Sequence, residues 1–411
     1  MKTTGPDLRG GLVDLAAIEE ARGRLEGVAV TTPLDRSRAL SEHVGGPVFI
    51  KCENLQRTGS FKIRGAYNRI VRLDEAHKTC GVVAASAGNH AQGVALAASL
   101  AGAPARVFMP AAASLPKVEA TRRYGAEVVL TGKDFGEAFE AAVAFAEEHG
   151  STFVHPFDHP DVIAGQGTVG YEIVEQLADV NTVVVPVGGG GLISGVSAAV
   201  KALKPSTRVV GVQAKGAASF KPSLERGSPV TLDRLSTIAD GIAANSPGEL
   251  TLAHVRENVD EIVEVSDEAI AEALVLTLER MKLVLEPAGA AGVAAVVENV
   301  AELKPPVVVL LSGGNIDPLL LLRVIRFGLS ASGRYFAFHT RIADRPGELH
   351  RLLGLMAEMG ANVVGVSHHR EGVEVDLGQV EVTLQVETKG PNHIGEIRSR
   401  LAASGYPIDP R

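Results

Sequence analysis

The segment NLQRTGSFKIRGA, residues 54–66, places Lys62 directly after the aromatic Phe61, between glycines at positions 59 and 65. A lysine that serves only a surface salt bridge does not need an aromatic neighbour in a glycine-flanked turn. Such a setting suits a lysine that acts as a nucleophile. The segment therefore makes Lys62 the first candidate for a catalytic residue.

Around this segment, apolar runs rich in valine and leucine alternate with amphipathic stretches over most of the chain. The runs cover residues 81–85, 105–110, 126–130, 181–187, 207–213 and 305–312. They lack polar alternation, which predicts strands that are buried on both faces of parallel sheets. The chain is thus predicted to be an α/β protein with mostly parallel sheets.

The pattern changes near Gly333. The strands predicted beyond it cover 334–342, 361–370 and 374–388, and the helices cover 345–360 and 392–405. This βαββα series is compact enough for a small domain of its own. A fourth strand is predicted only as a short or edge strand in YPIDPR, residues 406–411, because proline interrupts it.

Composition excludes several classes of function. The 411 residues are 45% hydrophobic, which allows two or three domains, and the net charge of −8 argues against a nucleic-acid surface. No apolar run reaches the ~18 residues of a membrane helix, and the first residues, MKTTGPDLRGG, lack the apolar core of a signal peptide. The two cysteines, Cys52 and Cys80, are expected to be reduced thiols of a cytoplasmic protein.

Three predicted strands end in unusual turns, and ligands of open parallel sheets bind beyond such strand ends. The turns are SAGNHAQG at 86–93, GGGGLISG at 188–195 and SGGN at 312–315. In the second turn, adjacent glycines let backbone N–H groups converge on an anion, and the following helix adds about half a positive charge. This turn predicts a phosphate site without a lysine, and it fits neither a Walker loop nor a dinucleotide turn.

The other two turns complete a possible ligand set. SAGNHAQG offers Ser86, Asn89 and backbone N–H groups to a small carboxylate, and SGGN places the Ser312 hydroxyl at a strand end. Each turn by itself is equally explained as a helix cap. Together with Lys62 they suit a phosphorylated aldehyde cofactor, which needs an amine, a phosphate site and a partner for its ring nitrogen, and an amino-acid substrate.

The segments ENLQRTGSFKIRGA, SAGNHAQG, GGGGLISG, EPAGA and SGGN resemble, in this order and spacing, the threonine dehydratases (threonine ammonia-lyases). These are pyridoxal-phosphate enzymes of fold type II, the tryptophan-synthase-β group. The resemblance implies a two-lobed catalytic domain over 1–330, with a smaller lobe, about 50–155, inserted in the larger one. The tail, 334–411, with IADRPGEL at 342–349, resembles an α+β ACT domain, the amino-acid-sensing module of metabolic enzymes.

The resemblance also implies a role for each matched residue. The cofactor-binding residues are Lys62, Phe61, Asn89, Gly188, Gly189, Gly190, Gly191, Leu192 and Ser312. Lys62 matches the catalytic Schiff-base lysine, Asn89 the partner of the cofactor's phenolic oxygen, and Ser312 the partner of its ring nitrogen. The substrate-binding residues are Ser86, Ala87, Gly88, Asn89, His90 and Glu286. Glu286 of EPAGA is also explained as a carboxylate favoured at a helix N-terminus.

The implied reaction is β-elimination of L-threonine to 2-oxobutanoate and ammonia, and of L-serine to pyruvate, in isoleucine biosynthesis or threonine catabolism. Serine racemases of this fold have a serine where this chain has Ala87, and carboxylates where it has Gln213 and Ser219. Racemisation is therefore expected to be minor, and no divalent metal is expected to be required. A cytoplasmic homotetramer or homodimer is expected.

In the tail, the resemblance makes Asp344 a partner for the amine of an allosteric amino acid, isoleucine or valine, and Gly347 a point of close approach. The same residues are also explained as an ordinary helix-start turn. Three other functions remain open: a serine dehydratase or another β-eliminating or β-replacing enzyme of the fold, a non-catalytic amino-acid sensor, and a nicotinamide oxidoreductase. The missing downstream acid argues against the last.

Overall fold

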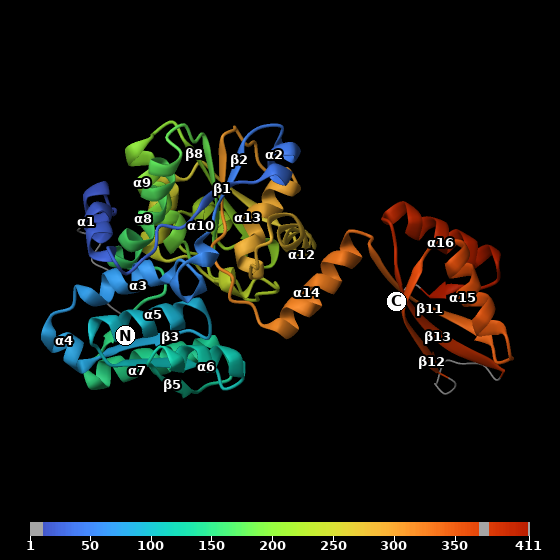
Figure 1. Cartoon of the computed structure of the whole chain (residues 1–411). Helices are drawn as coiled ribbons and strands as arrows, with labels where there is room; N and C mark the ends of the chain where they lie inside the picture. The colour runs from blue at the N-terminus through green and yellow to red at the C-terminus, as the bar shows by residue number, and fades with distance from the viewer. Residues whose placement is uncertain (1–10, 370–377, 410–411) are drawn as a thin grey trace. The chain divides into compact units, whose positions relative to one another are not determined.

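The computed structural model describes residues 11–369 and 378–409. The chain divides into two compact units, residues 1–321 and 322–411, and each is described here by itself (Figure 1). The first part of the strand expected over 374–388 lies outside the described residues. Within the described ranges, no helix is both long and apolar enough to cross a membrane.

The larger sheet of the first unit has six strands in the order β1-β2-β10-β7-β8-β9. Its strands are β1 Leu34–Arg36, β2 Val48–Lys51, β7 Thr182–Pro186, β8 Arg208–Ala214, β9 Glu261–Val265 and β10 Val307–Leu310. Every neighbouring pair is parallel except β1 and β2. The central strands β7 and β10 are buried along their whole length, as their unbroken valine runs predict.

A smaller sheet has four parallel strands in the order β5-β4-β3-β6. Its strands are β3 Val82–Ala85, β4 Ala105–Met109, β5 Glu127–Leu130 and β6 Thr152–Phe153, and its helices are α5 Asn89–Ala101, α6 Leu115–Arg123 and α7 Phe135–His149. Alternate residues of β3 face opposite sides: Val82 packs with α5, and Val83 packs with α7. Figure 1 shows α5 and α7 on the two sides of this layer. Along the chain, β3 to β6 are inserted between β2 and β7 of the larger sheet.

The remaining helices of this unit cover the larger sheet and join it to the smaller one. They are α1 Leu15–Leu25, α2 Arg38–Val44, α3 Lys62–Val71, α4 Glu75–Cys80, α8 Pro160–Gln176, α9 Gly191–Leu203, α10 Phe220–Arg226, α11 Glu249–Asn258, α12 Asp267–Leu276 and α13 Pro287–Val297. Helices α3 and α8 meet at glycines: a Cβ on Gly165 would lie 2.5 Å from the Arg64 carbonyl oxygen. This close approach explains why the sequence needs glycine here.

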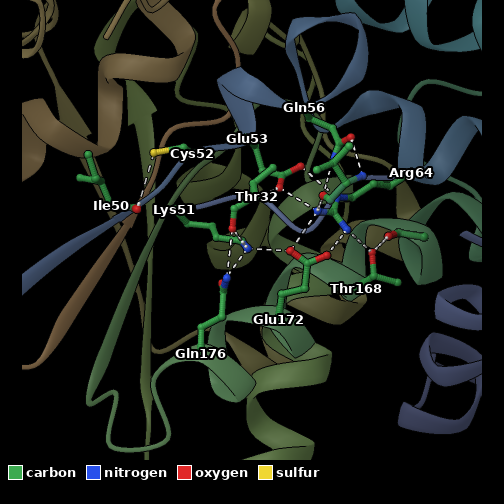
Figure 2. A network of polar contacts seen from close by, with 12 residues as sticks. Thr32, Ile50, Lys51, Cys52, Glu53, Gln56, Arg64, Thr168, Glu172 and Gln176 are labelled. Atoms are coloured by element: carbon green, nitrogen blue, oxygen red, sulfur yellow. Dashed lines mark hydrogen bonds and ion pairs between the residues drawn. The ribbon is translucent and has the colours of Figure 1, made fainter. Parts of the chain in front are cut away.

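Two buried cations and two buried carboxylates meet where β2, α3 and α8 converge (Figure 2). The Arg64 guanidinium donates to both carboxylate oxygens of Glu53, at 2.8 and 2.9 Å, and to Glu172 at 2.6 Å. Lys51 Nζ donates to the other oxygen of Glu172 at 2.6 Å. Burial would raise the pKa of Glu172, but Arg64 and Lys51 hold it below its usual value. The formal charges of this network balance, and it fixes the first turn of α3, where Lys62 lies.

The second unit carries a four-stranded antiparallel sheet in the order β12-β13-β11-β14. Its elements are β11 Tyr335–Ala343, α15 Glu348–Glu358, β12 Asn362–His369, β13 Gln379–Glu387, α16 Pro391–Ala403 and β14 Ile408–Asp409. The helix α14, Pro318–Ala331, spans the boundary between the units. The sheet packs against α15 and α16 in a single hydrophobic core. This core includes Phe338 of β11, Leu352 of α15 and Ile397 of α16. The edge strand β14 pairs with β11 over two residues, which confirms the predicted short fourth strand.

Replacing Arg64 by methionine should lower the free energy of unfolding by about 3–5 kcal/mol, because Glu53 and Glu172 would remain buried without their cation. Thermal unfolding followed by circular dichroism measures the change. Arg38→Met is the matched control, since it breaks an exposed pair with Glu42 and should cost less than about 1 kcal/mol. Equal changes in unfolding free energy in the two variants would contradict the proposed contribution of this network to stability.

Candidate active site

Lys62 is the first residue of α3, and its side chain reaches the end of the smaller sheet. Its Nζ donates a hydrogen bond to the Pro156 carbonyl oxygen at 2.8 Å and lies 5.2 Å from the centre of the Phe61 ring. Pro156 belongs to the turn HPFD, residues 155–158, which follows β6 at its carboxyl end. The predicted nucleophile thus lies at a strand end, where ligands of parallel sheets bind.

Burial sets the charge state of the lysine. It lowers the pKa of Lys62 to about 8, while the Glu286 carboxylate acts in the opposite direction. Burial, with a contribution from the Lys62 charge, also lowers the pKa of both His90 and His155 to about 3. At neutral pH these imidazoles are uncharged, and a larger fraction of Lys62 is the free amine than for an exposed lysine. The free amine is the form that acts as nucleophile or base.

The glycine turn at 188–191 also contacts the HPFD turn. Gly190 adopts a left-handed conformation, with φ 97°, and caps α9. A Cβ on Gly189 would lie 2.3 Å from the Phe157 ring, and one on Gly191 would lie 2.8 Å from Phe157 Cβ. The glycines therefore admit Phe157 and leave the first N–H groups of α9, which have no intrahelical acceptor, for an anion. The HPFD turn therefore contacts both Lys62 and the glycine turn before α9, two features that the sequence predicted separately.

The turn after β3 begins α5. Ser86 Oγ accepts a hydrogen bond from the Gly88 backbone N–H at 3.1 Å, and residues 86–89 remain partly exposed. The His90 imidazole is buried and bonded to the Val154 carbonyl oxygen at 2.8 Å. The His90 side chain is therefore already bonded. The group of His90 that a carboxylate could accept a hydrogen bond from is its backbone N–H, in the first turn of α5.

A chain of polar side chains runs across the site. Asn89 Nδ2 donates to Glu286 Oε1 at 2.6 Å, and Asn315 Nδ2 donates to Asn89 Oδ1 at 2.8 Å and to the Thr58 carbonyl oxygen. Burial, with the nearby charge of Asp240, raises the pKa of Glu286 to about 7. Glu286 stands at the N-cap position of α13, yet its side chain makes no capping bond, so its contact with Asn89 distinguishes it from a simple cap.

Ser312 follows β10 and lies against the segment that carries the lysine. Its backbone carbonyl accepts a hydrogen bond from the Phe61 N–H at 3.3 Å, and the next residue, Gly313, forms an isolated antiparallel bridge with Ser60. The Ser312 side chain is buried. Through these contacts, the first and last of the predicted motifs adjoin each other in the fold.

Sequence reasoning missed the HPFD turn and Asn315. The turn follows β6, a strand of only two residues, so the apolar-run pattern did not show it; the two prolines of VHPFDHP were the available signal. Asn315 was part of the quoted motif SGGN, where only the serine was given a role. Among residues 11–369 and 378–409, no group of three or more His, Cys, Asp or Glu side chains is arranged to hold a metal ion.

Comparisons with known proteins identify the family of the chain. A family model described as pyridoxal-phosphate dependent enzyme matches residues 26–313. The chain is 50% identical to the L-threonine ammonia-lyase of Thermotoga maritima over 97% of this chain and 99% of that protein. The corresponding values for the L-threonine ammonia-lyase of Geobacter sulfurreducens are 47%, 95% and 98%. The processed form of threonine deaminase isoform 2 from Solanum lycopersicum superimposes with a TM-score of 0.74 and 39% identity, over 79% of this chain and 90% of that chain.

In the ligand-free protein, Lys62 should titrate near pH 8 and not near its ordinary value of 10.5, because burial disfavours its charged form. Competitive labelling with acetic anhydride across pH 6–10, read by peptide mass spectrometry, measures this midpoint. Glu286→Gln should lower it further, since the carboxylate raises the pKa of Lys62. A midpoint above 10, or no response to the variant, would contradict the electrostatic description.

Proposed function

The chain belongs to the family of pyridoxal-phosphate dependent enzymes, and we propose from this membership that it is a threonine ammonia-lyase. It converts L-threonine to 2-oxobutanoate and ammonia, and L-serine to pyruvate and ammonia. The observation that carries the assignment is 50% identity to an L-threonine ammonia-lyase over 97% of the chain. The role in isoleucine biosynthesis or in threonine catabolism follows from the same reaction.

The residues of the site fit pyridoxal phosphate. The Lys62 amine, whose pKa burial lowers to about 8, is the group for covalent attachment. The turn 188–192, with its left-handed glycine and the first N–H groups of α9, would hold the phosphate. Ser312 would meet the ring nitrogen and Asn89 the phenolic oxygen. When bound, the cofactor supplies an electron sink for negative charge at the substrate Cα.

The chain's own residues then bind the substrate and move its proton. The Ser86 turn and the N-terminus of α5 receive the carboxylate, which the helix dipole favours. The Lys62 amine would take the Cα proton as general base, and its lowered pKa keeps it competent near neutral pH. The Cβ–O bond breaks and the hydroxyl takes up a proton to leave as water, and the released enamine hydrolyses to the 2-oxo acid and ammonia. Because Ala87 offers no proton on the opposite face, racemisation is minor.

We propose that this reaction needs no divalent metal. Gln213 holds its own loop: its Nε2 donates to the Ala217 carbonyl oxygen at 3.2 Å, and its Oε1 accepts from the Phe220 N–H at 3.0 Å. Residues 213–220 are thereby joined by a neutral amide at the positions where the resemblance to serine racemases implies carboxylates of a cation site. This geometry supports the proposal because the loop is already tied by a neutral side chain.

The purified enzyme should form 2-oxobutanoate from L-threonine, and Lys62→Ala should reduce kcat at least about a thousandfold, since the variant loses both the attachment point and the base. The keto acid is measured by coupled reduction, with L-serine assayed in parallel. Lys78→Ala, at an exposed pair with Glu75, is the control and should keep full activity. Faster turnover of serine would favour a serine dehydratase, and a wild-type protein inactive on both amino acids would favour a non-catalytic sensor.

We further propose that residues 1–330 form the catalytic domain and that 334–411 form an ACT-like regulatory domain in a homotetramer or homodimer. The βαββαβ order of the second unit, with a four-stranded antiparallel sheet and two helices in one core, supports this assignment. The turn between β11 and α15 contains Asp344, and Gly347 adopts φ 97° with open space where a Cβ would lie. An amino acid, isoleucine or valine, would bind beside this turn.

Isoleucine or valine should bind the full-length enzyme and change its threonine kinetics, and Asp344→Ala should weaken that binding about tenfold or more by removing the carboxylate for the ligand amine. Isothermal titration calorimetry measures the affinity, and initial rates measure the response. Asp134→Ala, at a helix cap of the first unit, is the control and should leave the affinity unchanged. Equal affinity in wild type and Asp344→Ala would contradict the proposed site.

A further inference from the structure

Asn315 connects the loop before Lys62 to Asn89. Its Nδ2 donates one hydrogen bond to the Thr58 carbonyl oxygen and another to Asn89 Oδ1, at 2.8 Å. A backbone carbonyl is only an acceptor, so the Thr58 contact requires Asn315 to present its amide nitrogen there. With both N–H groups used as donors, Asn315 can meet only an acceptor on Asn89.

This fixes which way the Asn89 amide faces. An asparagine amide can exchange the positions of its oxygen and nitrogen by rotation, and its hydrogen-bond partners decide between the two. Because Asn89 Oδ1 faces Asn315, Asn89 Nδ2 faces Glu286, to which it donates at 2.6 Å. Glu286 alone would fix this orientation less firmly, since a protonated carboxyl can also donate and burial raises the pKa of Glu286 to about 7.

The backbone around these side chains is shaped to admit them. Thr58 adopts a left-handed conformation, with φ 63°, which is uncommon for a residue other than glycine and directs its carbonyl toward Asn315. A Cβ on Gly59 would lie 2.4 Å from Asn315 Oδ1. A Cβ on Gly313 would lie 2.3 Å from Glu286 Oε1 and 3.0 Å from Asn89 Nδ2. Any larger residue at either glycine would displace the chain of amides.

Asn89 also lies on the face of α5 that packs against the lysine. Gly93 is one helical turn further along α5, and a Cβ there would lie 3.1 Å from the Lys62 carbonyl carbon. Residues four apart share one face of a helix. Asn89 donates one N–H of its amide to Glu286. Its second N–H is therefore available on the side of the site where Lys62 lies.

We propose that Asn315 is a positioning residue, which locks the Asn89 amide so that an N–H, and not the carbonyl oxygen, faces the cofactor's phenolic oxygen. The proposal rests on the proposed function, because it takes the bound group to be pyridoxal phosphate. Asn315 does not touch the reacting atoms. It acts through Asn89, and its own orientation is set by the hydrogen bond to the Thr58 carbonyl oxygen.

Asn315→Asp tests the proposal, because a carboxylate of the same shape cannot donate to Thr58 or Asn89. The visible absorbance of the resting holoenzyme, without substrate, is titrated between pH 6 and 10 for Asn315→Asp, Asn89→Ala and the double variant. Each single change should move the midpoint of the cofactor's visible band upward by about one unit, since an N–H donor stabilises the state with more negative charge on the phenolic oxygen. The double variant should show no further shift, and kcat/KM should fall at least about tenfold in all three.

Asn54→Asp is the matched control, because it makes the same change in an asparagine whose amide donates to the Val284 carbonyl oxygen at 3.3 Å. It should leave the band in place. Asn315→Ala is titrated in the same cycle and carries the test if the aspartate variant unfolds or loses the cofactor.

An unshifted band in the Asn315 variants, or shifts that add to that of Asn89→Ala, would overturn the proposal. An unshifted band in Asn89→Ala would overturn it as well, by removing the group through which Asn315 acts. Threonine deamination by the wild type is measured separately: its absence overturns the proposed function, while the spectral cycle still decides the role of Asn315.

Discussion

The buried guanidinium of Arg64 is bound both by Glu53, next to β2, and by Glu172 in the C-terminal half of α8. Taking these charges out of water is costly, and only near-complete pairing makes the arrangement tolerable. That requirement leaves α3 a single position relative to β2 and α8. Lys62 lies half a helical turn before Arg64, so the same constraint that seats the arginine also aims the lysine at the HPFD turn. The reactive amine is placed by a network that takes no part in the reaction.

Glycine is the second constraint, because the site is assembled from backbones and side chains that approach more closely than a Cβ allows. Gly165 lets α8 reach α3, Gly189 admits the Phe157 ring beside the N-terminus of α9, and Gly313 makes room for Glu286 against Asn89. These residues come from three distant parts of the chain. The N-termini of α5, α9 and α13, the end of β10 and Lys62 therefore lie around one site. Each of these glycines is needed for a close contact.

The sequence predicted the α/β alternation, the reactive lysine and the three strand-end turns because each depends on local pattern: unbroken valine runs, a glycine run or a lysine beside an aromatic. Family resemblance then supplied the reaction and cofactor, which the comparisons confirmed. The sequence did not reveal the Arg64 network, whose carboxylate Glu172 is 108 positions away, or the HPFD turn after a two-residue strand. Asn315 was also missed as a partner of Asn89, because no local signal marks a contact across 226 positions.

Burial, more than any single counter-charge, sets the working pH of this site. It lowers the pKa of Lys62 to about 8 and raises that of Glu286 to about 7, so both groups move toward neutrality. Each also weakly opposes the change in the other, since the carboxylate favours the ammonium and the ammonium favours the carboxylate. As pH rises through 7, Glu286 ionises, and its negative charge favours the ammonium form of Lys62. Lys62 then loses its proton near pH 8. The lysine thus becomes a free amine within the range where a general base is most effective.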